Sequence, residues 1–243
     1  MFRTILWFIK FWLYQIYAFK FWLIISKMEK KGYIKESEAF LHENIMVWAK
    51  AMVENTGSMI KLTGAENIPA EGAVLFASNH QANFDIPILL GYLNKPKGFV
   101  AKVELEKLPL VNRWMKKMRC VFLDRKDTRK SMKAINEAIE IMKSGHSMII
   151  FPEGTRSKSS RIGEFKKGSL KMAIKANVPV VPVTINGSYK IMGAKGIIIT
   201  PSEVEVIVGR PVYPDTLKDE QKHDFAQYIK KKIVDNLVND HAG

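Results

Sequence analysis

This chain of 243 residues lacks several features that would place it in a common functional class. Its single cysteine, Cys120, excludes an intramolecular disulfide, and a lone cysteine in an apolar run is typical of a small core residue. No G-x-S-x-G sequence occurs, so the usual setting of a serine nucleophile is missing. A glycine-rich nucleotide loop and a Cys/His metal cluster are also missing, and we therefore expect neither a metal nor a bound cofactor.

The amino-terminal segment, residues 1–27, has no acidic residue but holds ten of the chain's aromatic side chains. Its four basic residues fall within an arc of about 120° on one helix face. Only nine residues separate Lys10 from Lys20, whereas a membrane span needs about 20 apolar residues. The pattern favours a helix lying in the membrane plane, with a tilted span as the main alternative. A cleaved signal peptide is disfavoured, because charge interrupts the run and no small-residue cleavage site follows.

We predict that basic and aromatic side chains of this helix bind the membrane, namely Arg3, Trp7, Phe8, Lys10, Phe11, Trp12, Lys20, Trp22 and Lys27. A helix that only docks on the protein's own core is less favoured, because ten aromatic residues would have to fit on one modest domain. A second helix is expected over residues 36–60, after a turn at Gly32. Residues 1–60 would form a two-helix membrane-binding motif in front of a domain at 61–243.

Short apolar runs alternate with helical patterns in the rest of the chain. This alternation predicts an α/β fold with a mixed, largely parallel sheet flanked by helices. Strands are expected at 73–78, 98–101, 120–123, 147–151, 180–185, 197–200 and 204–208. Helices are expected at 87–93, 110–117, 129–143, 168–176 and 225–237.

The most informative segment is residues 78–85, Ser-Asn-His-Gln-Ala-Asn-Phe-Asp. Imidazole is the usual general base near neutral pH, and a carboxylate that holds one ring N–H makes it more effective. Positions five apart do not share a helix face, so His80 and Asp85 can meet only if the chain turns between them. In the alternative interpretation, Asp85 only caps the following helix and His80 is an ordinary loop histidine.

A second polar cluster, Phe-Pro-Glu-Gly-Thr-Arg-Ser at residues 151–157, follows an apolar run that reads as a buried strand. Ligands of open α/β sheets bind beyond the carboxyl ends of the strands. Gly154 lets the backbone approach a ligand, Thr155 offers a hydroxyl, and the Arg156 guanidinium matches phosphate oxygens. The alternative is an ordinary polar turn with a solvated arginine.

In this order and in a chain of this length, the two clusters resemble the H-x4-D and FPEGTR boxes of the glycerolipid acyltransferases, and most of all those of the lysophosphatidate acyltransferases. The resemblance covers residues 64–210 and is specific in these two boxes only. It implies a glycerol-3-phosphate acyltransferase-like fold. It also implies acyl transfer from a thioester to the sn-2 hydroxyl of lysophosphatidic acid, giving phosphatidic acid, with His80 as general base oriented by Asp85. The missing serine motif favours direct transfer without an acyl-enzyme.

The resemblance also implies a site for the acceptor's glycerol phosphate. Its residues would be Glu153, Gly154, Thr155 and Arg156. Arg125, at the end of 120–125, matches the box whose arginine contacts the acceptor phosphate, and 178–183 resembles an apolar fourth box. Backbone amides near 81–84 or at the Gly154 turn are candidates for stabilising the oxyanion.

The net charge of +14 is concentrated in three segments. Residues 1–27, 95–133 and 156–175 carry net charges of +4, +9 and +6, whereas the remainder is net negative. Such a field attracts anionic lipid, an anionic acceptor, and an acyl carrier protein or coenzyme A thioester. A nucleic-acid partner is not expected, because no nucleic-acid motif is present. We expect a monotopic or peripheral protein on the cytoplasmic face of the cell membrane. The alternatives are another lysolipid acceptor or a non-catalytic lipid-binding protein.

Overall fold

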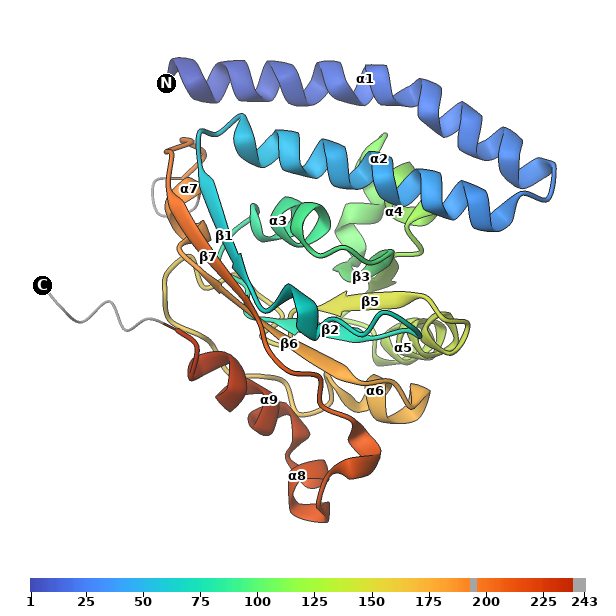
Figure 1. Ribbon diagram of the computed structural model, residues 1–243, viewed down its shortest axis with the longest axis vertical. Helices are drawn as coiled ribbons and strands as arrows, with labels where there is room; N and C mark the ends of the chain where they lie inside the picture. The colour runs from blue at the N-terminus through green and yellow to red at the C-terminus, as the bar shows by residue number, and fades with distance from the viewer. Residues whose placement is uncertain (193–195, 238–243) are drawn as a thin grey trace, which may run out of the picture.

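The structure, a computed structural model, describes residues 1–192 and 196–237, and a seven-stranded sheet lies at its centre (Figure 1). The strands are β1 (Met59–Thr63), β2 (Leu75–Ser78), β3 (Lys97–Lys102), β4 (Val121–Leu123), β5 (Ser147–Ile150), β6 (Val180–Asn186) and β7 (Glu203–Val208). Their order is β1-β7-β6-β2-β5-β3-β4, and every neighbouring pair is parallel except β6 and β7. The predicted mixed, largely parallel sheet is therefore confirmed.

Helices cover both faces of this sheet. They are α1 (Phe2–Lys30), α2 (Ile34–Glu54), α3 (Asp85–Tyr92), α4 (Val111–Lys117), α5 (Thr128–Lys143), α6 (Lys171–Ala176), α7 (Ser188–Ile191), α8 (Asp219–His223) and α9 (Phe225–Val234). Three 3-10 helices lie at Ala65–Asn67, Val103–Lys107 and Pro214–Thr216.

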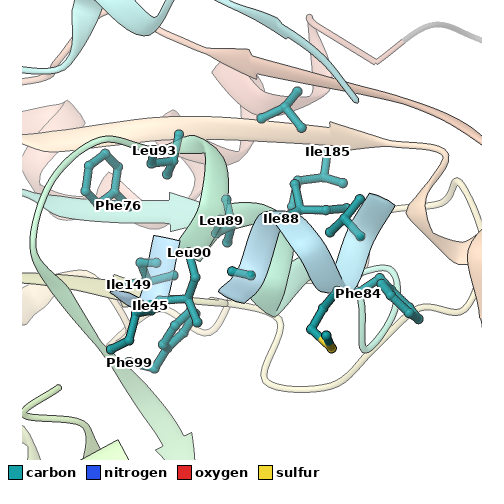
Figure 2. Packing of buried hydrophobic residues seen from close by; sticks show 14 of the residues in the cluster. Ile45, Phe76, Phe84, Ile88, Leu89, Leu90, Leu93, Phe99, Ile149 and Ile185 are labelled. Atoms are coloured by element: carbon teal, nitrogen blue, oxygen red, sulfur yellow. The ribbon is translucent and has the colours of Figure 1, made fainter. Parts of the chain in front are cut away.

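The two faces of the sheet belong to two hydrophobic clusters, because successive side chains of a strand point to opposite sides. On β2, Phe76 belongs to the cluster that includes residues of α1, α2 and α3. Leu75 on the same strand belongs to the cluster built with α5, α6 and α9. Figure 2 shows the first cluster, in which Ile45 of α2 and the leucines of α3 lie near Phe76 and Ile149 of the sheet.

Helix α3 lies between α2 and the sheet, and α1 runs along α2 on its far side (Figure 1). The two inner helices approach closely at Gly91, where an added Cβ would lie 2.9 Å from the backbone nitrogen of Lys50. The α1 side chains Trp7 and Ile25 share their hydrophobic cluster with Phe76 of β2. The amino-terminal helices are thus packed into the same core as the sheet, and the division after residue 60 remains a prediction.

Two expected elements need correction, and two short helices were not expected. Helix α2 ends at Glu54, not at residue 60, and Gly57 turns the chain with φ +79° into β1. The expected strand at 197–200 is irregular, with Ile197 and Ile198 exposed. The short helices α7 and α8 were not expected. By contrast, the predicted turn at Gly32 is present, with φ +83°.

Candidate active site

The two polar clusters meet because β2 and β5 are parallel neighbours, so the loops after both strands leave the same edge of the sheet. The loops are joined by backbone hydrogen bonds. Ser157 N donates to His80 O at 2.8 Å, and Lys158 N donates to Gln81 O at 3.1 Å. Segments about seventy residues apart in the sequence therefore form one unit around His80.

His80 and Asp85 are in direct contact, with 2.7 Å between Nδ1 of His80 and Oδ2 of Asp85. The chain turns between them and α3 begins at Asp85, which confirms the expected geometry. With Nδ1 protonated and donating to Asp85, Nε2 of His80 is left to accept a proton. His80 also lines the apolar cavity described below.

The carboxylate of Asp85 is fully buried and accepts four hydrogen bonds. In addition to His80, the donors are Gln81 N at 2.7 Å, Ala82 N at 2.9 Å and the hydroxyl of Ser188. A buried carboxylate is stable only with such partners. Phe84 is the N-cap of α3 and no side chain caps that helix, so the interpretation of Asp85 as a simple helix cap is wrong.

The loop around His80 is also fixed against β6. The side-chain amide of Asn79 exchanges two hydrogen bonds with the backbone of Ile185, each of 2.8 Å. Gln81 Oε1 accepts from Gly187 N at 3.0 Å. The imidazole itself stacks on the ring of Phe151, with centroids 3.9 Å apart and planes 14° apart. The position and orientation of the imidazole are therefore set by several elements at once.

Glu153 is the second buried carboxylate at this edge, and it contacts the main chain on both oxygens. Oε1 accepts from His80 N and Oε2 accepts from Gly163 N, both at 2.7 Å. Burial raises the pKa of Glu153 above its ordinary value, although the backbone donors of His80 and Gly163 oppose that shift. Glu153 does not line the cavity, so its predicted contact with the acceptor glycerol is not seen in this arrangement. In this position it holds the backbone of His80.

A cavity of about 690 Å³ opens from His80 between the sheet and the amino-terminal helices. Most of its wall is apolar, and its polar end carries cationic groups. The apolar wall includes Phe11, Tyr14, Phe21, Ile45, Trp48, Ile86, Leu90, Phe99, Val111, Trp114, Met115 and Met118. The polar end includes His80, Lys102, Arg125, Thr155 and Arg156. Such a cavity suits a molecule with a long hydrocarbon chain and an anionic end.

Arg125 and Arg156 are brought together at this polar end, as the sequence predicted. The Arg125 guanidinium donates to Gly154 O, and that of Arg156 donates to Asn83 Oδ1. Neither arginine has a carboxylate within 4.0 Å in the part of the chain that the structure describes. Gly154 has φ +76°, a conformation that glycine adopts without strain. Guanidinium groups without internal counter-ions are typical of an anion site.

The inner edge of α1 is docked on the protein. Trp7 is buried and its Nε1 donates to Met52 O at 2.8 Å, so its predicted role in binding lipid is wrong. The Arg3 guanidinium donates to Thr56 O at 2.8 Å, and Lys10 Nζ donates to Asn55 Oδ1 at 2.7 Å. Sequence periodicity did not reveal this edge, because aromatic residues occur all around the helix.

The other predicted membrane-binding residues are distributed between the two sides. Phe8, Phe11 and Trp22 are half-buried, and Phe11 lines the cavity. Trp12, Lys20 and Lys27 are exposed, and Lys20 Nζ lies 3.8 Å from the ring centroid of Tyr17.

The outer face of α1 is exposed and apolar. It includes Phe2, Ile5, Ile9, Trp12, Leu13, Ile16, Tyr17, Phe19 and Leu23. In the described residues, α1 is the one helix long and apolar enough to cross a membrane, and only 17% of its most apolar window is buried. A core helix of a soluble protein would be mostly buried. Sequence reasoning missed Ile197 and Ile198, which lie beside the start of α1 and are 69% and 39% exposed.

Among residues 1–192 and 196–237, no group of three or more His, Cys, Asp and Glu side chains could hold a metal ion. Ser188, which lies just after β6 at the start of α7 and donates to Asp85, was not predicted, because nothing near it in the sequence marks it. The stacking of Phe151 on His80 was also missed, although Phe151 stands next to the second cluster.

Comparison with known proteins gives a consistent picture. Residues 59–186 match the family model described as Acyltransferase. The chain is 38% identical over 172 residues to the chloroplastic 1-acyl-sn-glycerol-3-phosphate acyltransferase BAT2 of Brassica napus, covering 68% of this chain and 49% of that protein. It is 34% identical over 189 residues to the probable 1-acyl-sn-glycerol-3-phosphate acyltransferase of Mycoplasma pneumoniae, covering 73% of this chain and 70% of that protein. The chain thus spans about half the length of the Brassica napus protein and of a similar protein of Arabidopsis thaliana.

Among solved structures, the fold is similar to the crystal structure of the 1-acyl-sn-glycerophosphate (LPA) acyltransferase PlsC from Thermotoga maritima. The TM-score is 0.86 at 30% identity, and the match covers 97% of this chain and 93% of that chain. These similarities confirm the resemblance that the two sequence clusters indicated.

Proposed function

Because the chain belongs to the acyltransferase family, we propose that it transfers a fatty acyl group from a thioester to the sn-2 hydroxyl of lysophosphatidate, forming phosphatidate. One observation carries the proposal: the His80–Asp85 pair lies at the polar end of an apolar cavity that also presents Arg125 and Arg156. The names of the relatives and of the similar crystal structure support the acceptor.

In the proposed reaction His80 acts as the general base. Its Nε2 takes the proton of the acceptor hydroxyl while the hydroxyl oxygen attacks the thioester carbonyl carbon. The tetrahedral intermediate then collapses, the carbon–sulfur bond breaks, and the leaving thiolate takes the proton back from His80. Asp85 holds the Nδ1–H side of the ring and stabilises the imidazolium that forms between these steps.

The oxyanion of that intermediate needs a donor that is not already used. The amides of Gln81 and Ala82 donate to Asp85. The amide of Gly154 donates to the carbonyl of Phe151. The backbone candidates that remain from the predicted set are the amides of Asn83 and Phe84.

The two unpaired guanidinium groups suit the acceptor phosphate, with Thr155 and the Gly154 turn beside them. The apolar wall suits a fatty acyl chain. A phosphate at the polar end would keep the hydrocarbon chain in the cavity and the hydroxyl near His80. The donor is an acyl carrier protein or coenzyme A thioester, both of which are acidic and complement the positive charge near the site.

Membrane binding is proposed to occur through the outer face of α1. Two contacts dock the helix near its ends, Trp7 with Met52 and Glu29 with Lys117. A transmembrane span would require α1 to leave these partners, so an in-plane, monotopic position fits the structure better. Ile197 and Ile198 would enter the same lipid layer. The side of the membrane is proposed to be the cytoplasmic face of the cell membrane.

An acceptor panel tests the proposal. Purified protein in detergent micelles is supplied with acyl carrier protein or coenzyme A thioester, and with 1-acyl lysophosphatidate, lysophosphatidylglycerol or monoacylglycerol. Mass spectrometry of the products is expected to show phosphatidate acylated at the sn-2 position as the preferred product. Preferential acylation of lysophosphatidylglycerol would overturn the acceptor, and no acylation with either donor would favour the non-catalytic alternative.

A further inference from the structure

We propose that Lys166 is a further phosphate-binding residue, which acts with Arg125 at the Gly154 turn. The inference rests on the proposed function, because the phosphate would belong to one of its substrates. Lys166 lies outside both sequence clusters and carries a positive charge that no other described residue neutralises.

The geometry around Gly154 carries the inference. A Cβ placed on Gly154 would lie 3.1 Å from Lys166 Cε, 3.3 Å from Lys166 Nζ and 3.4 Å from Arg125 Cζ. The ammonium and the guanidinium therefore converge on one point above the turn. Two like charges in such proximity repel each other, and an anion bound between them removes that repulsion.

The position of Lys166 is fixed by the fold. Its backbone N donates to Pro152 O at 3.1 Å, and Gly163 N donates to Glu153 at 2.7 Å. Phe165, the preceding residue, is buried. The segment that carries Lys166 is thus bound on both sides to the loop that carries the Gly154 turn.

Nearby carboxylates are engaged elsewhere. Both oxygens of Glu153 face backbone amides, and Glu164 pairs with Lys230 at 2.7 Å. In the described ranges, Lys166 has no carboxylate within 4.0 Å. In the simpler interpretation Lys166 is a solvated lysine, which would not need to lie on the same side of the Gly154 turn as Arg125.

The ligand chemistry is a phosphate ester, and two substrates could supply it. One is the phosphate of lysophosphatidate, and the other is the phosphate of the pantetheine arm that carries the acyl thioester. Gly154 and Arg125 line the cavity, whereas Lys166 is not part of its lining, so a group bound above the turn lies at the edge of the polar end, between Lys166 and the cavity. Steady-state kinetics with each substrate varied in turn separates the two sources.

The test compares Lys166→Met with Lys166→Arg and with Lys167→Met. Lys167 is the adjacent lysine, is exposed like Lys166 and is not among the atoms nearest to the Gly154 Cβ position, so it is a matched control for the loss of one positive charge. We expect Lys166→Met to raise the KM of one substrate about tenfold, since hydrogen bonds to charged groups are worth more than neutral ones. Lys166→Arg should restore most of that loss, kcat should change little, and Lys167→Met should match the wild type.

A raised KM for lysophosphatidate assigns Lys166 to the acceptor, and a raised KM for the thioester assigns it to the donor. Unchanged KM values for both substrates, in an active protein, would overturn the inference. A wild type without turnover would count against the proposed function instead. Isothermal titration of lysophosphatidate and of the thioester into the three variants then tests Lys166 directly, and equal affinities in Lys166→Met and Lys167→Met would contradict it.

Discussion

The two loops at the edge of the sheet differ in how their charges are balanced. In the first loop the buried Asp85 accepts four hydrogen bonds from within the chain, one of them from His80. At the second loop, Arg156 and the neighbouring Arg125, which follows β4, donate to an amide and a carbonyl oxygen and have no carboxylate partner among the described residues. The His80–Asp85 pair is thus complete within the chain, whereas the two guanidinium groups are left without a carboxylate partner, as the proposed binding of an anionic substrate requires.

The same contrast separates the two sides of α1. Its inner edge is packed and hydrogen bonded through Trp7, whereas its outer face leaves large apolar side chains such as Leu13 and Ile16 exposed. Groups whose hydrogen bonds and packing are satisfied within the chain hold the site in place. Charged or apolar groups without such partners indicate what the protein binds. Substitutions of the satisfied groups around Asp85 should therefore reduce turnover. Substitutions of the unpaired arginines or of the exposed apolar residues should reduce binding of the substrate or of the membrane.

The largest effect is expected at Asp85. Asp85→Asn replaces one acceptor oxygen with an amide that cannot hold the His80 Nδ1–H in the same way, and kcat should fall at least about 100-fold with little change in KM. Initial rates in micelles measure this. The matched control is Asp127→Asn, an acid at the start of α5, which should retain wild-type turnover. A kcat for Asp85→Asn within a few-fold of the wild type would contradict the assigned role.

Arg156 tests whether the unpaired guanidinium groups bind the acceptor phosphate. Arg156→Ala removes a guanidinium at the polar end of the cavity and should raise the KM of lysophosphatidate about twentyfold, with a smaller change in kcat. Arg161→Ala, an exposed arginine of the same loop that does not line the cavity, serves as the control. An unchanged KM would remove Arg156 from the phosphate site.

Ser188 tests whether turnover depends on the hydrogen bond that Asp85 accepts from the donor most distant in the sequence. Ser188→Ala leaves one oxygen of Asp85 without the hydroxyl that donates to it from the start of α7, and kcat should fall about tenfold. KM should stay near the wild-type value, because Ser188 does not line the cavity. A lower melting temperature combined with an unchanged kcat would show that the hydroxyl serves stability alone.

The smallest effect is expected at Ile197 and Ile198, which lie beside the start of α1. Changing both Ile197 and Ile198 to serine removes apolar surface from the proposed lipid-facing side, and liposome binding should weaken about threefold. Cosedimentation with anionic vesicles measures the binding. The control is Tyr213→Ser, an exposed site that does not lie beside the start of α1. Equal binding of the two variants would exclude Ile197 and Ile198 from the membrane surface.

Much of this arrangement could be predicted from sequence, because its signals are local. Both clusters directly follow strands, and the parallel pairing of β2 with β5 brings His80 and Arg156 to one edge. Strand β1 escaped prediction, because its five residues alternate between exposed and half-buried positions and carry no long apolar run.

Contacts that depend on distant packing could not be predicted. The hydroxyl of Ser188 reaches Asp85 from more than a hundred residues away. Trp7 is indistinguishable in sequence from the exposed Trp12, and only the packing of α1 on α2 separates them. Glu153 was predicted to contact the acceptor, but its carboxylate accepts from the backbone of His80 and Gly163. A sequence motif does not show whether a side chain faces the cavity or the main chain.

The most direct test of the central claim compares wild-type and His80→Ala protein for phosphatidate formation from lysophosphatidate and an acyl thioester. Circular dichroism first establishes that both are folded. If His80 is the general base, the wild type should form phosphatidate and His80→Ala should form it at least about 100-fold more slowly. A folded His80→Ala protein that retains most of the wild-type rate would contradict it.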